Sequence, residues 1–291
     1  MKTLMLLFAA AVSLLGLANQ ARAQQPAYFV TYSHELEEPR NLEIGTSTTI
    51  GSPGSGHPAF FAPFIELEYG ATAWWTSELY LEGQSTAGDS ALFTGWRLEN
   101  RFRPLFREHV INPVLYFEYA STNEASKIMK EIVGNVETAA EINADARRVH
   151  AHEVETKLIL SSNTHNWNLS GNFIVEKNLS EDEGFEFGYA LGASRKLATM
   201  ASAENCRFCR ENFAAGLEMY GGLGSTNGFG LHNTVHYLAP VLAWQFSDNA
   251  AVQFSPAVRL TRVGNPVLFR ISYIYEVRGF GTKVARLFGG G

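Results

Sequence analysis

Segments of about ten residues, in which apolar and polar side chains alternate, recur between residues 27 and 278 of this chain. In residues 267–277 the odd positions carry Val, Phe, Ile, Tyr, Tyr and Val, whereas even positions 270, 272 and 276 carry Arg, Ser and Glu. Successive side chains of a β-strand point to opposite faces, so this pattern gives each strand one apolar and one polar face. It restricts the chain to all-β folds, and the segment length is typical of outer-membrane barrel strands.

A secreted soluble β-sandwich is the alternative, because its strands also alternate. Here the apolar face is nearly free of charge and rich in Phe, Tyr and Leu, and aromatic residues make up 12% of the chain. Charges of both signs recur at mid-strand on the polar face, where they suit a wet barrel interior. We therefore predict a closed antiparallel transmembrane β-barrel of about twelve strands, with fourteen as the alternative, short periplasmic turns and longer outer loops.

Assigning the linkers alternately to the two ends of the barrel places the longest one, residues 123–149, on the outer side, where long loops belong. Residues 27–50 conflict with this count, because they resemble two strands around Glu37–Arg40 and would give thirteen in all. Both termini of such a barrel normally lie in the periplasm, which requires an even number of strands. The prediction therefore stays at twelve.

Within the long linker, "EASKIMKEIVGNV" (residues 124–136) places Ile128, Met129, Ile132 and Val133 at helical spacing. The spacing predicts a short amphipathic helix that lies on the barrel mouth or plugs it. An ordered surface loop without a gating role is the alternative.

The first 23 residues predict the compartment. A short positive start with Lys2 precedes an apolar run from residue 4 to 18, and Ala21-Arg22-Ala23 follows it, as in a secretory signal peptide. A retained membrane anchor is the alternative, but the run is short for a membrane span. We expect removal of residues 1–23, a barrel over residues 24–280, and a tail over 281–291 that either hangs in the periplasm or continues the last strand.

The predicted signal holds two of the 23 basic residues and no acid, so the mature chain carries 21 basic and 29 acidic residues. This balance argues against a nucleic-acid partner. We expect a monomer in outer-membrane lipid. The side chains predicted to line the lumen are Glu99, Arg101, Glu118, Glu155, Lys157, Glu176, Arg259, Arg270 and Glu276. Their mixed signs favour polar or zwitterionic solutes.

Tryptophan and cysteine give two further predictions. Trp74, Trp75, Trp167 and Trp244 lie beside turns assigned to the periplasmic side, where an interfacial aromatic girdle would lie. Cys206 and Cys209 form the chain's one cysteine pair, and in an oxidising compartment they favour a local disulfide. A redox site or half of a metal site is the alternative for this C-x-x-C motif.

No catalytic or metal site is predicted. His150 with His152, and His232 with His236, are pairs without a visible third ligand, and no G-x-S-x-G motif is present. The acidic pairs Glu66/Glu68 and Glu153/Glu155 suit a charged lining better than a glycosidase centre. We expect no cofactor and no enzymatic activity; an outer-membrane hydrolase is the minor alternative.

The runs "NPVLYFEY" (residues 112–119), "ETKLILS" (155–161) and "NLSGNFIVEK" (168–177) resemble uncharacterised outer-membrane β-barrel proteins of Gram-negative bacteria. These are loosely grouped with transporters linked to the degradation of aromatic compounds. The resemblance covers about a third of the chain and implies passage of a small hydrophobic or aromatic solute. The alternative function is a non-conducting structural or adhesive surface barrel.

Overall fold

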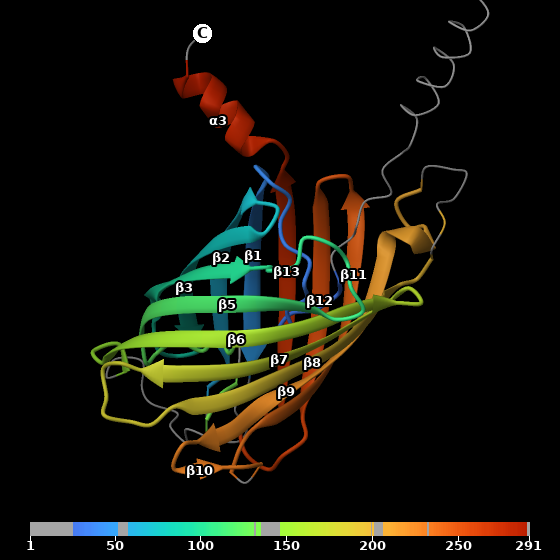
Figure 1. The fold of residues 1–291 in the computed structure, drawn as a ribbon. Helices are drawn as coiled ribbons and strands as arrows, with labels where there is room; N and C mark the ends of the chain where they lie inside the picture. Colours follow the sequence, from blue (N-terminus) through green and yellow to red (C-terminus); the bar gives the residue numbers. More distant parts are fainter. Residues whose placement is uncertain are drawn as a thin grey trace, which may run out of the picture.

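The computed structural model describes residues 26–51, 58–130, 132–134, 146–198, 200, 206–231 and 233–289. The predicted signal peptide lies outside these residues. Twelve antiparallel strands form a closed barrel, and one further two-residue strand, β10, pairs with the end of β9 (Figure 1). The barrel strands are β1 Leu42–Gly51, β2 Phe60–Thr72, β3 Trp75–Thr86, β4 Ala91–Phe102, β5 Asn112–Asn123, β6 His150–Thr164, β7 Trp167–Asn178, β8 Glu186–Lys196, β9 Phe213–Ser225, β11 His236–Ser247, β12 Ala250–Arg259 and β13 Val267–Val277.

Closure comes from the pairing of the first strand with the last. β1 and β13 pair from Leu42↔Val277 to Gly51↔Leu268. Every other barrel strand pairs with its neighbours in chain order, and β10 (Gly228–Phe229) pairs only with β9. The prediction of a closed twelve-stranded antiparallel barrel is therefore confirmed, and the fourteen-stranded and β-sandwich alternatives are wrong.

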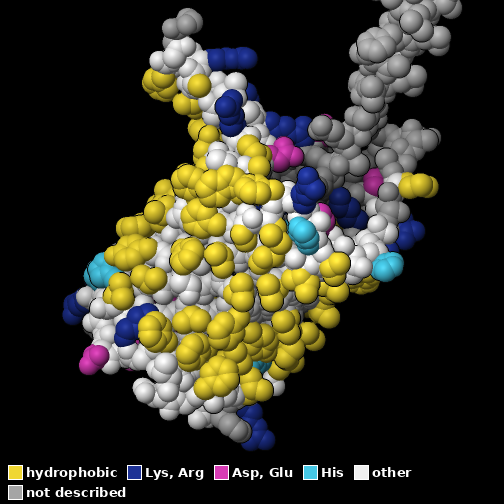
Figure 2. All heavy atoms as spheres, in the orientation of Figure 1, with side chains coloured by type: hydrophobic (Ala, Val, Ile, Leu, Met, Phe, Trp, Pro, Cys, Tyr) yellow, Lys and Arg dark blue, Asp and Glu magenta, His cyan; other side chains and the backbone are white. Residues whose placement is uncertain are grey.

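The alternation in sequence becomes an inside and an outside. In β13, Phe269, Ile271 and Tyr273 are exposed on the outer surface, while Arg270 and Ser272 are buried inside. Figure 2 shows hydrophobic side chains spread over the barrel wall and charged side chains mainly near its ends. A continuous apolar outer surface of this kind is stable against lipid hydrocarbon rather than water. No helix within the described part of the chain is long and apolar enough to cross a membrane.

The two barrel ends carry different connections. Tight turns join β2 to β3, β6 to β7 and β11 to β12 at the end where the chain leaves β13, the predicted periplasmic end. Two longer connections, residues 103–111 and 197–212, are also at this end, so the expected rule of short periplasmic turns holds only in part. The longest linker, between β5 and β6, is at the opposite, predicted outer end.

Residues 27–50 contain one strand, not two. β1 begins at Leu42, and residues 26–41, here called the inner segment, run through the barrel interior without strand pairing until residues 38–40, which are exposed (Figure 1). Pro39 has no backbone N–H to donate and Arg40 has a φ of 69°, so the chain turns there instead of extending. The even-numbered side chains Tyr28, Tyr32 and His34 contact Asn168, Glu99 and Ser161 of the barrel wall, so the wall takes the place of a neighbouring strand.

The helix predicted in residues 124–136 is absent from the described part of that stretch. Residues 124–130 and 132–134, here called the inward loop, are irregular and fold into the barrel, where Ile128 is 2% exposed. Met129 has a φ of 51°, which interrupts a right-handed helix. Backbone bridges join Val133 to Gly188 and Gly134 to Gly224. The apolar residues at helical spacing therefore do not form one face of a helix, and Ile128, Met129 and Ile132 pack inside the barrel instead.

The C-terminal tail does not continue the last strand. β13 ends at Val277, and Gly279 takes the left-handed conformation with a φ of 61°. The helix α3 (Phe280–Phe288) then projects from the barrel end (Figure 1). Its base is tied by the Gly281 N–H, which donates to the Arg40 carbonyl, and by the Phe280 ring against Tyr69.

Candidate pore

The inner segment is fastened to the barrel wall through its backbone. The Glu218 carboxylate of β9 accepts hydrogen bonds from the N–H groups of Phe29, Val30 and Thr31 at 2.9, 2.9 and 2.6 Å. On β7, Asn172 accepts from the Tyr32 N–H at 2.7 Å and donates to the Tyr32 carbonyl at 2.9 Å. Side chains of the wall thus replace the strand partner that these backbone groups lack.

A second anchor joins His34 to the wall. Its Nδ1 lies 2.8 Å from the Ser161 hydroxyl and its Nε2 lies 3.0 Å from the Glu108 carboxylate. These are the residue types of a hydrolase triad, but the Ser161 residue is 2% exposed, and its oxygen accepts a 3.2 Å hydrogen bond from Asn168. A nucleophile needs room for its substrate, so this group is assigned to holding the segment.

A charged wall faces the inner segment. Arg101 of β4 pairs with Glu68 at 2.5 Å, with Glu99 at 3.3 Å, and with Glu78. Lys130 of the inward loop pairs with Glu99 at 2.7 Å. The side chains thereby connect three strands and the inward loop in one ion-pair network.

The network continues around the barrel. Arg97 pairs with Glu82 at 2.5 Å and with Glu118 at 2.9 Å, and Lys157 pairs with Glu155 at 2.9 Å. The Tyr32 ring of the inner segment lies among these cations, 5.1 Å from the Arg101 guanidinium carbon and 4.6 Å from the Lys157 Nζ. Tyr32 also donates to Glu99 at 2.9 Å. Aromatic faces attract such cations, so the ring helps to seat the segment against the wall.

The inward loop is fixed by its backbone carbonyls. The Thr49 hydroxyl donates to the Ile128 carbonyl at 2.7 Å, and the Arg270 guanidinium donates to the Met129 carbonyl. The loop therefore narrows the lumen from the predicted outer side, while the inner segment narrows it from the other.

A cavity of about 130 Å³ remains between the inner segment and the wall from β12 through β1 to β4. Its charged lining comprises Glu35, Glu43, Glu66, Glu68, Glu78, Arg101 and Lys130. Single carboxylate oxygens of Glu66, Glu68 and Glu78 lie within 4.8 Å of one another. Carboxylates outnumber cationic groups here, so the cavity is more acidic than the balanced lumen expected from sequence.

The predicted lumen residues lie on the inward parity of their strands. Buried inside the barrel are Glu99, Arg101, Glu118, Glu155, Lys157 and Arg270. Half-buried, nearer the barrel ends, are Glu176, Arg259 and Glu276. Glu43, Glu78 and Glu218 also point inward but are not among the predicted lumen residues, although their parity within their strands is a usable signal. Tyr32 and Lys130 carry no such signal, because their positions depend on how two irregular segments fold inward.

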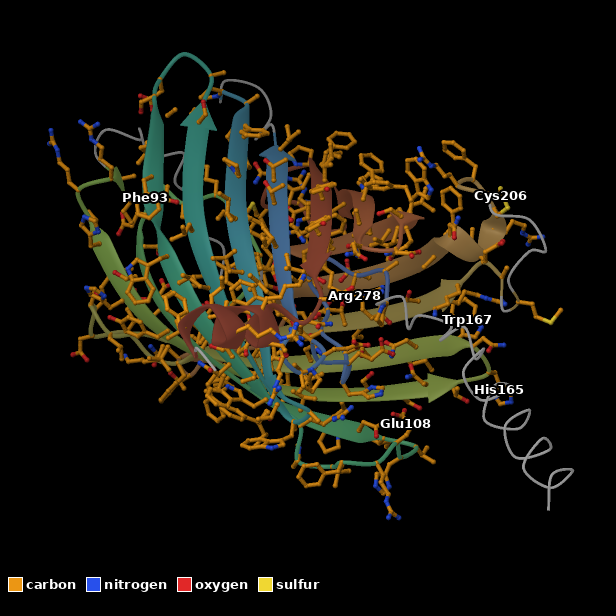
Figure 3. The ribbon with its side chains drawn as sticks, turned by 90° about the horizontal axis from the view of Figure 1, so that it is seen from above. Phe93, Glu108, His165, Trp167, Cys206 and Arg278 are labelled. Atoms are coloured by element: carbon orange, nitrogen blue, oxygen red, sulfur yellow. A yellow bond between two sulfur atoms is a disulfide. The ribbon has the colours of Figure 1, made fainter. Side chains whose placement is uncertain are left out.

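The remaining predicted residues lie outside the lumen. Trp74 and Trp75 are at the β2–β3 turn, Trp167 begins β7, and Trp244 is near the end of β11, all at the predicted periplasmic end. Trp167 is seen beside the β6–β7 turn residue His165 in Figure 3. The four side chains are partly or well exposed there, as an interfacial girdle requires.

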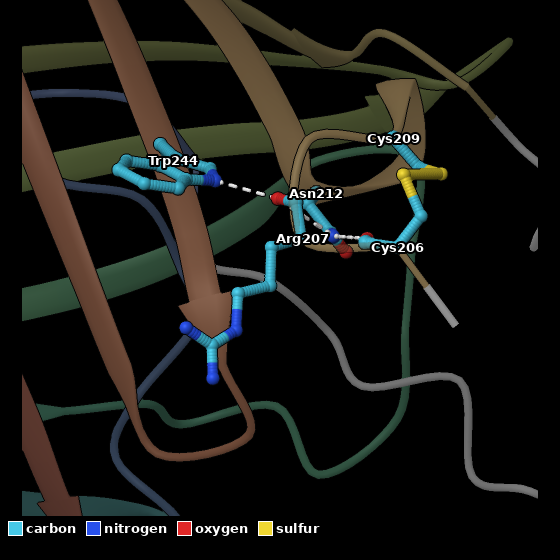
Figure 4. The surroundings of a disulfide bond; sticks show 5 residues. All are labelled: Cys206, Arg207, Cys209, Asn212 and Trp244. Atoms are coloured by element: carbon cyan, nitrogen blue, oxygen red, sulfur yellow. Dashed lines mark hydrogen bonds between the residues drawn. A yellow bond between two sulfur atoms is a disulfide. The ribbon is translucent and has the colours of Figure 1, made fainter.

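Cys206 and Cys209 form a disulfide in the connection between β8 and β9, with their Cα atoms 5.4 Å apart (Figure 4). The Arg207 carbonyl between them accepts from the Trp244 indole at 2.8 Å and from Asn212 at 3.2 Å. The Phe208 ring stacks on Trp244 with their centroids 4.7 Å apart. The disulfide closes a tight loop within this connection, and the contacts of Arg207 and Phe208 with Trp244 tie that loop to β11.

The histidine pairs do not form a metal site among the described residues. His150 and His152 are exposed on the outer face of β6, and the His152 Nδ1 lies 2.9 Å from the Tyr119 hydroxyl. His232 lies outside the described residues. His236 contacts the Thr234 and Tyr189 hydroxyls at 2.8 and 3.0 Å.

No protein-family model and no curated protein sequence matches this chain. Among solved structures, it is similar to the COG4313 outer membrane channel from Pseudomonas putida F1, at 14% identity over 87% of this chain and 100% of that one, with a TM-score of 0.52. Others are the KdgM porin in complex with disordered oligogalacturonate (7% identity, 81% and 98% coverage, TM-score 0.47) and the CymD monoaromatic hydrocarbon channel (10%, 85% and 91%, 0.42). The likeness to the COG4313 outer membrane channel shows that the two chains share the β-barrel fold.

Proposed function

We propose that this protein is an outer-membrane barrel through which small solutes cross passively. This proposal rests on one combination of features: the outer wall of the barrel is apolar, while its interior is charged and polar and encloses a cavity. The first property stabilises the barrel in lipid, and the second gives water and polar solutes a compatible path. Residues 1–23 would direct the chain to the periplasm and be removed there.

The two inward segments set the expected size of the solute. The inner segment and the inward loop occupy much of the lumen, and a cavity of about 130 Å³ is left beside the charged wall. Only small molecules would pass with both segments in place. The acidic lining of this cavity favours polar over apolar cargo, in contrast to the aromatic solutes that the family resemblance implies.

A non-conducting structural barrel is the second candidate, and the same two segments favour it. If they close the lumen permanently, the ion-pair network would serve stability alone. Both functions share the fold and the location but differ in whether any solute crosses.

Swelling of proteoliposomes separates the two candidates. Purified full-length mature protein is reconstituted, and the vesicles are diluted into isosmotic neutral solutes of increasing size. If the protein is a channel, the vesicles should swell rapidly in the smallest solutes. The swelling rate should fall steeply as solute size increases, because the lumen is narrow. Vesicles containing heat-unfolded protein are the control. Swelling no faster than this control for every solute would favour the structural barrel.

A further inference from the structure

Nine consecutive strands each place a glutamate directly opposite the glutamate of the next strand. This set, here called the glutamate row, has eight successive register pairs. Its members, from β13 through β1 to β8, are Glu276, Glu43, Glu68, Glu78, Glu99, Glu118, Glu155, Glu176 and Glu186. Directly paired residues share one face of a sheet, and the buried members show that this face is the lumen.

The row climbs from one mouth of the barrel to the other. Glu276 is the last residue but one of β13 and Glu43 is the second of β1, both at the predicted periplasmic end. Glu176 lies two residues before the end of β7, and Glu186 is the first residue of β8. Both are therefore near the predicted outer end of the barrel. Strands about 4.8 Å apart and tilted by about 40° make such a row rise about 25 Å over eight steps, the height of the apolar band.

Stability alone does not account for the row. Like charges directly opposite each other on neighbouring strands destabilise a sheet. The cations within 4.0 Å of row members among the described residues are Arg97, Arg101, Lys130, Lys157 and Arg278. These cations are shared among neighbouring carboxylates, so acidic groups line the interior along the whole row.

Two independent features place cation-attracting groups beside the row. The cavity of about 130 Å³ has Glu43, Glu68 and Glu78 of the row in its lining, with Glu66 added. Glu37 of the inner segment is 6% exposed, and one of its carboxylate oxygens has no hydrogen-bond partner among the described residues. Glu37 lies near Glu276, at the predicted periplasmic end of the row, and burial, followed by the charges of Glu276 and Glu38, raises its pKa to about 7, so this carboxyl is only partly ionised at neutral pH.

We propose that the glutamate row is a continuous path for small cations through the barrel, so that the channel passes cations in preference to anions. This inference rests on the proposed channel function and specifies its solute class. Carboxylate oxygens spaced along a narrow, low-dielectric passage concentrate counter-ions and repel anions, and neighbouring sites let a cation move from one to the next. The lysines and arginines keep each site from holding a cation too tightly to release it.

The test is the reversal potential of the full-length mature protein in a bilayer of zwitterionic lipid, across a roughly tenfold KCl gradient. We expect K⁺ to be about tenfold more permeant than Cl⁻. E43Q and E176Q, each one position from an end of the row, should each lower that ratio at least about twofold. E181Q removes the same charge from an exposed position in the loop between β7 and β8 and should leave the ratio unchanged.

The outcomes separate the two proposals. Current steps with no preference for K⁺, or with a K⁺ preference that both row variants retain, would overturn the cation path and leave the channel intact. A folded protein that gives no current steps would overturn the channel and the cation path together. Heat-modifiable gel mobility identifies any variant that has not folded, and the remaining row variant then decides.

Discussion

At the scale of single residues, the interior is organised by carboxylates in three different roles. Glu218 holds backbone N–H groups, Glu68 and Glu78 share the Arg101 guanidinium, and Glu43 lies at the cavity. Sequence parity indicates that each of them points inward, because period-two alternation identifies the polar face. It does not show which one faces which, since register depends on loop lengths and on pairing across strands.

Glu218 supports a direct prediction. Glu218→Ala leaves the buried N–H groups of Phe29, Val30 and Thr31 without an acceptor, at a cost of roughly 1–3 kcal/mol each. We expect amide hydrogen exchange in residues 27–33 to accelerate strongly while the barrel strands stay protected. Glu218→Gln keeps one acceptor oxygen and should have a smaller effect. Unchanged protection of the segment in Glu218→Ala would show that other contacts hold it.

The raised pKa of Glu37 predicts that the stability of the barrel depends on pH. Its pKa is raised to about 7 in the folded barrel, so its neutral form is favoured there. The contribution of neutral Glu37 to the free energy of unfolding is fully present below the ordinary carboxyl pKa. It is lost as the pH rises through about 7.

Glu37→Gln stays neutral at every pH and removes this loss. The thermal midpoint, followed by circular dichroism, should therefore fall less for the variant than for the wild type between pH 5 and pH 8. Equal falls in the two proteins would refute this role for Glu37.

At the scale of elements, the twelve strands were predictable because each carries its own alternation. The irregular elements were not. The inner segment alternates like a strand, yet its backbone pairs with Glu218 and Asn172 instead of a neighbouring strand. The inward loop has apolar residues at helical spacing, yet the backbone carbonyls of Ile128 and Met129 accept hydrogen bonds from side chains of the barrel wall. Local pattern cannot distinguish these cases, because tertiary partners decide them.

The inner segment should limit conduction. Deletion of residues 26–36 removes Tyr32 and His34 from the lumen and leaves the strands and Asn41 in place. We expect the single-channel conductance to rise several-fold, because a wider path carries more ions. The measurement is the current step in a planar bilayer, with the Glu218→Ala variant giving an intermediate value. A conductance equal to that of the wild type would mean that the segment does not obstruct the path.

The C-terminal helix should be dispensable for assembly. α3 follows the last strand and contacts the barrel only at its base, through Gly281 and Phe280 among the described residues. Deletion of residues 282–291 keeps these contacts, so the variant should fold and show wild-type heat-modifiable mobility in gels. Loss of the folded form would show that barrel assembly needs the helix.

At the scale of the whole molecule, the fold combines a lipid-compatible exterior with an interior filled from both ends. Fold class and strand number were predictable from periodicity. The acidity of the lumen was not, because Glu43, Glu68 and Glu78 come together only through register and closure between β1 and β13. The two inward segments and the glutamate row together define a narrow lumen lined by many carboxyl groups.

The central claim is that ions cross this barrel with both inward segments in place. Single-channel recording of the purified wild-type protein in symmetric KCl tests it most directly. We expect discrete current steps of small amplitude, because the lumen is narrowed by the inner segment and by the inward loop. A protein that is folded and inserted, but gives no steps above the bare bilayer, would contradict it.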